Sequence, residues 1–118
     1  MKVNVLGTEY DILLKKYDED PVFSEKHLDG YHNYWAKQIV VCILSTHPGW
    51  KEDQEADALV AQKETIRHEI VHAFFAESGL QDSASQFEGA WCKSEELVDW
   101  IALQGPKIYK AWVEAGAV

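Results

Sequence analysis

Apolar residues in the middle of the chain recur with the spacing of one helix face. They lie three, four or seven positions apart, the rhythm of a helix turned toward a core, at Leu59, Ile66, Ile70, Ala73 and Phe74. Acidic residues open this segment, which suits the positive end of a helix dipole, and Gly79 follows it as a favourable C-terminal cap. The pattern predicts one long helix from about Asp53 to Ser78.

The first third of the chain has the pattern of β-strands. Residues 3–14 carry β-branched and aromatic residues on both sides of Gly7-Thr8, which predicts a strand, a turn and a second strand. Residues 23–28 predict a short helical turn. The run Ile39–Leu44 is almost wholly apolar and rich in β-branched residues, which favours a strand against the core.

The last quarter of the chain predicts a second helix. Ser94 is a favourable N-cap, and the acids Glu95 and Glu96 occupy the first turn after it. A broad apolar surface then follows, formed by Leu97, Val98, Trp100, Ile101 and Leu103. Gly105-Pro106 is expected to interrupt or kink this helix before residues 107–115 resume it. The polar residues 81–93 between the two helices predict a loop.

Length and charge limit the classes of function. The 118 residues predict a single domain spanning residues 1–118, and the net charge is -9. The basic residues are scattered, so we expect no nucleic acid among the partners. No apolar run has the length of a membrane span, and no signal peptide is evident, so we expect a cytoplasmic protein with no membrane partner. Cys42 is expected to be a small core residue. Cys92 is expected to be a free thiol near the candidate metal site described below.

The long helix contains the motif His68-Glu69-x-x-His72. Residues four apart stack on one side of a helix, so both imidazoles can be directed at one point. Zn²⁺ is the ion that such a pair suits best, and Glu69 is placed to accept a proton from a zinc-bound water. The alternative is a helix with two exposed histidines and a solvated glutamate.

A catalytic zinc needs a third protein ligand and one open position. Glu77 lies five residues beyond His72 and is expected to point away. Asp82 and Glu88 fall in a loop with no fixed orientation, whereas Glu95, Glu96 and Asp99 begin a helix. Glu95 is the preferred third ligand because Asp99, one turn later, can accept the other ring N–H of a ligand histidine. Glu96 is the alternate ligand, and simple capping of the helix by these acids is the other interpretation.

These motifs resemble the gluzincin type of zincin metallopeptidase, in which a glutamate on a later helix follows H-E-x-x-H. Ser94-Glu95-Glu96-Leu97-Val98-Asp99 is similar to the family's N-E-x-x-x-D, with Ser94 in place of the asparagine. The chain from about Asp29 onward looks like the small zincins of phages and mobile elements. The resemblance implies an α+β fold, with about three antiparallel strands on the HExxH helix and a C-terminal helix that bears the glutamate. It also implies that an edge strand binds extended substrate, and Ile39–Leu44 is the candidate for the strand near the cleft.

The resulting hypothesis is a zinc-dependent metallopeptidase that acts on a peptide or protein. His68, His72 and Glu95 would hold Zn²⁺, and Glu69 would act as the general base. His32, Tyr31 and His47 are all candidates for an oxyanion donor, and the sequence does not choose among them. The alternative is a protein-binding module on a zincin scaffold with structural or lost zinc. A weaker third hypothesis is a metal-dependent hydrolase with a non-peptide substrate.

Overall fold

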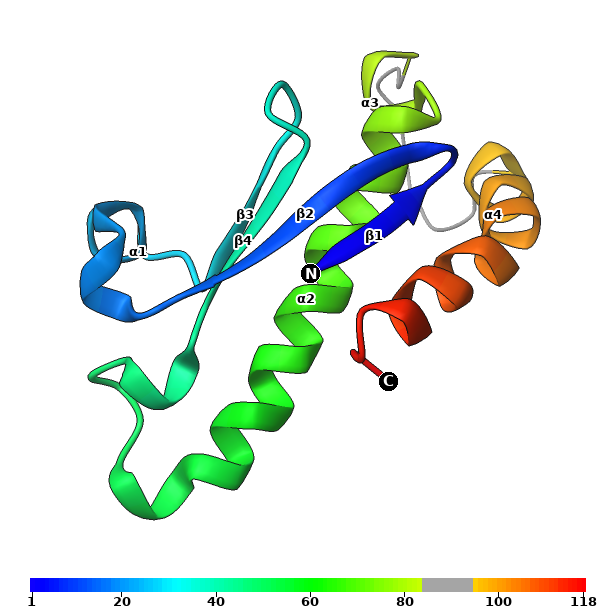
Figure 1. Ribbon diagram of the computed structural model, residues 1–118. Helices are drawn as coiled ribbons and strands as arrows, with labels where there is room; N and C mark the ends of the chain where they lie inside the picture. The colour runs from blue at the N-terminus through cyan, green and yellow to red at the C-terminus, as the bar shows by residue number, and fades with distance from the viewer. Residues whose placement is uncertain (84–94) are drawn as a thin grey trace.

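A four-stranded sheet lies across one long helix in the computed structural model, which describes residues 1–83 and 95–118 (Figure 1). The strands are β1 (Lys2–Val5), β2 (Thr8–Lys15), β3 (Gly30–Asn33) and β4 (Gln38–Cys42), in the order β1-β2-β4-β3. The predicted α+β class is confirmed. The sheet differs from the predicted antiparallel sheet of about three strands because β2 and β4 pair in parallel, while β1–β2 and β3–β4 are antiparallel.

The helices are α1 (Pro21–Glu25), α2 (Glu55–Glu77), α3 (Leu80–Ser83) and α4 (Glu95–Glu114). Three short 3-10 turns, Tyr17–Glu19, Leu44–Thr46 and Glu52–Gln54, lie in the connections. The bounds of α2 confirm the predicted long helix to within two residues at its start and one at its end. Gly79 follows it with φ 81°, in the left-handed region that favours glycine.

Helix α4 is continuous through Gly105-Pro106, so the interruption that was one of the two expectations for this position was wrong. Proline removes one backbone hydrogen bond and crowds the preceding turn. The turns after it are nevertheless fixed to the core through Ile108, Ala111 and Ala115, each 6% exposed or less. Tertiary packing therefore maintains a helix that the local sequence disfavours.

The central strand β4 is buried on both faces of the sheet. Ile39 and Val41 belong to the core cluster shared with α2 and α4. Val40 and Cys42 belong to a second cluster that contains Phe23 of α1. Successive side chains of a strand point to opposite faces, so a strand covered on both sides is apolar at every position. This explains the unbroken apolar run and confirms that Cys42 is a buried core residue.

The buried face of α2 changes along its length. Ile66, Ile70, Ala73 and Phe74 are buried under the sheet and α4 as predicted. Leu59, however, is 51% exposed, so its place in the predicted core face was wrong. The N-terminal turns of α2 extend beyond the sheet (Figure 1) and contact the Leu44–Thr46 turn instead, which buries Ala58.

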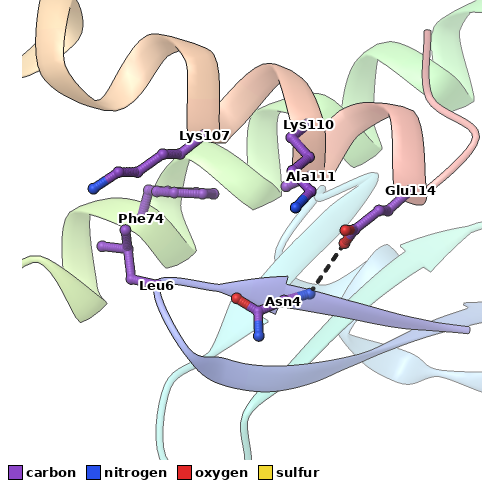
Figure 2. Close-up of a pocket in the computed structure, with 7 residues that line it drawn as sticks. All are labelled: Asn4, Leu6, Phe74, Lys107, Lys110, Ala111 and Glu114. Carbon is purple, nitrogen blue, oxygen red and sulfur yellow. Dashed lines mark hydrogen bonds between the residues drawn. The ribbon is translucent and has the colours of Figure 1, made fainter.

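Helix α4 packs beside β1 and along α2, and the C-terminal residues are anchored to α2. Arg67 donates a hydrogen bond from its guanidinium to the carbonyl of Ala117 at 2.7 Å. A hollow of about 180 Å³ lies between β1 and α4, and Figure 2 shows its lining residues Asn4, Leu6, Phe74, Lys107, Lys110, Ala111 and Glu114. None of these is a predicted site residue. Among the described residues, no helix has the length and apolar character needed to cross a membrane.

Candidate metal centre and adjoining groove

His68 and His72 meet on one face of α2. Their Nε2 atoms lie 3.1 Å apart, and the two rings face each other at 70° with centroids separated by 4.7 Å. Both side chains are solvent-exposed. Partial loss of hydration against the protein lowers the pKa of the His72 imidazole, and electrostatic repulsion from the facing His68 ring lowers it further. A lowered pKa keeps His72 neutral at neutral pH, which is the form that binds metals.

The separation of the two nitrogens suits a tetrahedral zinc ion. Two nitrogens that each lie about 2.0–2.1 Å from such an ion are about 3.3 Å apart. The observed 3.1 Å requires only a small movement of the rings to reach that distance. The two imidazoles therefore meet at one point, as the helical spacing predicted, and their separation is compatible with two corners of a tetrahedral zinc site.

Glu69 lies beside this pair but is buried. It is 6% exposed, and within the described part of the chain its carboxylate accepts no hydrogen bond. Burial raises the pKa of Glu69 above its usual value, and the nearby His68 offsets part of that effect. A carboxylate with a raised pKa and no competing partner is suited to accept a proton near neutral pH.

A groove runs between α2 and the segment His27–His32. One half, of about 390 Å³, is lined by His27, Leu28, Asp29, Gly30, Ala61, Glu64, Thr65, His68 and Glu69. The other half, of about 280 Å³, is lined by Leu28, Gly30, Tyr31, His32, His68, Glu69 and His72. The two halves share four residues, so the HExxH face lies where they meet.

One side of the groove is the edge strand β3. The amide of Cys42 donates to the carbonyl of Asp29, which makes 29 and 42 a hydrogen-bonded pair. Such pairs alternate along an antiparallel ladder, so the backbone groups of Gly30 and His32 point away from β4, toward the free edge. The strand near the cleft is therefore β3, and the expectation that Ile39–Leu44 would take this place was wrong, because that run forms an inner strand.

Gly30 brings β3 close to α2. A Cβ atom on Gly30 would lie 2.9 Å from Cγ2 of Thr65 and 3.1 Å from the carbonyl oxygen of Val40. The first distance is too short for real atoms, so a side chain here would push the strand away from the helix. The width of the groove therefore depends on a glycine at this position.

His32 is held at the groove by a chain of partly buried hydrogen bonds. The hydroxyl of Tyr10, itself fully buried, lies 3.3 Å from Nε2 of His32 and donates to Glu77 at 2.6 Å. Glu77 also accepts hydrogen bonds from Thr8 at 3.2 Å and from Lys37. Burial lowers the pKa of His32, with a further contribution from His72. Glu77 thus points away from the His68–His72 pair, as predicted. Its hydrogen bonds hold β2 and the β3–β4 turn to the end of α2.

The other two candidate oxyanion donors have partners elsewhere. The Tyr31 hydroxyl donates to Asp20 at 2.6 Å, and burial together with this bond raises the pKa of Tyr31 to about 12. His47 accepts a hydrogen bond from the amide of Gly49 at 2.8 Å and does not line the groove. Of these three side chains, His32 is therefore the one whose polar contact, with the Tyr10 hydroxyl, holds it beside His72 in the groove.

The predicted third ligands lie in the first turn of α4, and both Glu95 and Glu96 are exposed. This end of α4 is held near the HExxH face, because the Trp100 ring lies 4.8 Å from that of Phe75 and its Nε1 donates to Ser78. Within residues 1–83 and 95–118, no group of three or more His, Cys, Asp or Glu side chains is placed to hold a metal. The side chain of Asp99 and all of residues 84–94, which include Glu88, Cys92 and Ser94, lie outside what the structure describes.

Comparison of the chain with protein-family models, with curated proteins and with solved structures gave no match.

Sequence reasoning listed His32 but missed the hydrogen bonds that hold it. Tyr10, His32 and Glu77 are separated by 22 and 45 positions and come together only when β2, β3 and α2 pack. The local signal that was available is the Asp29-Gly30 dipeptide, a type that is common where a connection ends, and β3 begins at Gly30, two residues before His32. Nothing local indicates that Glu77 would be the common acceptor.

Proposed function

We propose that this protein is a zinc-dependent metallopeptidase whose site is the His68–His72 pair with Glu69 beside it. The observation that carries the proposal is the approach of two imidazole nitrogens to 3.1 Å beside a buried glutamate whose carboxylate accepts no hydrogen bond from the described residues. A glutamate buried in this state lowers the stability of a fold, so its presence is best explained by a chemical role. Glu95 is the proposed third ligand, with Glu96 as the alternate and Asp99 as the acceptor for a ligand ring N–H.

In the proposed site, the two histidines bind the metal and Glu69 transfers the proton. Zinc, when bound, would polarise a peptide carbonyl and lower the pKa of a coordinated water. His68 and His72 offer their Nε2 lone pairs to the ion. Glu69 accepts the proton of the attacking water and returns it to the leaving amine, a task for which burial has raised its pKa.

The free edge of β3 supports a peptide as the substrate class. The backbone groups of Gly30 and His32 point outward along the groove and can pair with an extended chain, as in other cases of strand addition. A peptide bound there would pass over the meeting point of the two groove halves, where Glu69 lies. An extended backbone is recognised in this way without a deep side-chain pocket.

The test compares two glutamates that line the same groove. Glu69→Gln should retain zinc but lower the cleavage of a random decapeptide library by about 10²–10⁴-fold, the usual contribution of a general base. Glu64→Gln removes an exposed carboxylate from the groove and should leave both zinc content and turnover near wild type. Full turnover in Glu69→Gln, or an equal loss in Glu64→Gln, would refute the mechanism.

A protein-binding module with structural or lost zinc is the second candidate. It is favoured by the finding that the described residues bring only two metal donors together. The two functions differ in one outcome of the library experiment. A zinc-loaded protein that captures peptides on β3 without cleaving any of them would support the binding module.

A further inference from the structure

The protons in the chain Glu77–Tyr10–His32 can be assigned by counting donors. An ionised carboxylate only accepts hydrogen bonds, and hydrogen bonds to Glu77 outweigh the effect of its burial, so that its pKa lies below the usual value. Tyr10 has a single hydroxyl proton, and this proton is donated to Glu77 at 2.6 Å. The contact of 3.3 Å between the Tyr10 oxygen and Nε2 of His32 must then use a proton on Nε2.

This assignment determines what His32 can offer to a ligand. Neutral histidine carries one ring proton, so a proton on Nε2 leaves a lone pair on Nδ1. Nε2 is turned toward the buried Tyr10, and Nδ1 is the only other polar atom of the ring. Because the His32 side chain lines the groove beside His72, its remaining function there is that of a hydrogen-bond acceptor. In this tautomer His32 has no free ring proton for an oxyanion, so it is not the oxyanion donor that was considered for it.

We propose that His32 is a ligand-contacting residue of the groove, and that Tyr10 and Glu77 are positioning residues which hold it in the Nε2–H tautomer. Its Nδ1 accepts a hydrogen bond from an N–H group of an extended peptide bound along β3. The peptide contact rests on the function proposed above, whereas the tautomer does not.

Nitrogen NMR of the histidine rings tests the tautomer directly, in the full-length protein with and without added zinc. At pH 7.5, His32 should show a protonated Nε2 and an unprotonated Nδ1, and Tyr10→Phe should shift it to a mixture of tautomers. His47 is an internal control, because the Gly49 amide donates to its Nδ1 and fixes the same tautomer independently. A proton on Nδ1 of His32 in the wild type, or a His32 pattern unchanged by Tyr10→Phe, would overturn the assignment.

Two inhibitors of different length test the peptide contact. His32→Ala should weaken binding of a peptide hydroxamate about 10-fold, the equivalent of one hydrogen bond. Tyr10→Phe should weaken it by a smaller factor. Acetohydroxamate binds a metal but has no peptide to reach His32, so His32→Ala should leave its affinity unchanged.

Three outcomes would refute the proposed contact between His32 and the peptide. They differ from the outcome that would refute the proposed function. Equal weakening of both inhibitors by His32→Ala, or loss of zinc from His32→Ala, would show that His32 acts on the metal instead. A peptide hydroxamate that binds wild type no more tightly than acetohydroxamate would exclude the peptide contact alone. Wild-type protein that binds no zinc and neither inhibitor would exclude the proposed function, and the NMR result on the tautomer would still stand.

Discussion

Replacement of Glu77 by alanine should strongly destabilise the fold, because Glu77 joins three parts of the chain. Its side chain is 13% exposed, forms an ion pair with Lys37, and accepts hydrogen bonds from Thr8 and Tyr10 of β2. Breaking a buried ion pair costs about 3–5 kcal/mol. The lower value, about 3 kcal/mol, applies here because a third of the Lys37 side chain is exposed to solvent.

This loss is large for a domain of this size. Typical stabilities of 0.05–0.15 kcal/mol per residue give about 6–18 kcal/mol for 118 residues. Urea unfolding followed by circular dichroism should therefore show a clearly lower midpoint for Glu77→Ala, with an unchanged m-value. Glu9→Ala is the matched control, since it breaks a 2.8 Å ion pair with Lys2 in which both side chains are more than 60% exposed. Its effect should be far smaller.

The contribution of Glu77 should also depend on pH. Burial alone would raise the pKa of this carboxyl, but the hydrogen bonds from Lys37 and Tyr10 outweigh burial and hold the pKa below its ordinary 4.5. A lowered folded-state pKa stabilises the protein fully above the unfolded value, and this contribution is lost as the pH falls through the folded value. The difference between wild type and Glu77→Ala should shrink below pH 4.5. Equal effects of Glu77→Ala and Glu9→Ala at pH 7 would refute this reasoning.

Glycine substitutions should change the stability by different amounts at different positions. Gly30→Ala should destabilise the protein by about 1–3 kcal/mol in urea unfolding, because its Cβ would overlap Thr65. An unchanged midpoint would show that β3 and α2 separate easily. Gly105→Ala should change the unfolding free energy by less than about 1 kcal/mol, because the helix propensity gained by alanine is offset by crowding of its Cβ against the ring of Pro106. Gly79→Ala should lower it by about 1–2 kcal/mol because φ is 81°. A gain of stability in Gly79→Ala, or a loss of several kcal/mol in Gly105→Ala, would contradict this reasoning.

The long helix and its motif could be predicted from the sequence because both are local. Helix periodicity and the capping glycine lie within one segment, and the i, i+4 spacing by itself brings His68 and His72 together. The burial of Glu69 and the exposure of Leu59 could not be predicted in the same way. Both depend on which turns of α2 are covered by the sheet and which extend past it.

The arrangement of the sheet and groove depends on contacts that are distant in sequence. Parallel pairing of β2 with β4 leaves no local pattern, since Ile12 and Ile39 are 27 positions apart. The edge strand β3 has only four residues, and its polar His32 and Asn33 gave no strand signal. The hydrogen bonds that connect Glu77 through Tyr10 to His32 form only when β2 has paired with β4 and β3 has joined the sheet at its edge. The sequence therefore predicted the HExxH helix but not the strand β3 that lines the other side of the groove.

The zinc content of the purified protein tests the central claim most directly. Elemental analysis should find one zinc per chain in the wild type and none in His68→Ala. His47→Ala, which removes a histidine outside the groove, should retain the ion. A wild type that takes up no zinc, or a His68→Ala variant that keeps it, would contradict the assignment of this helix face as a metal centre.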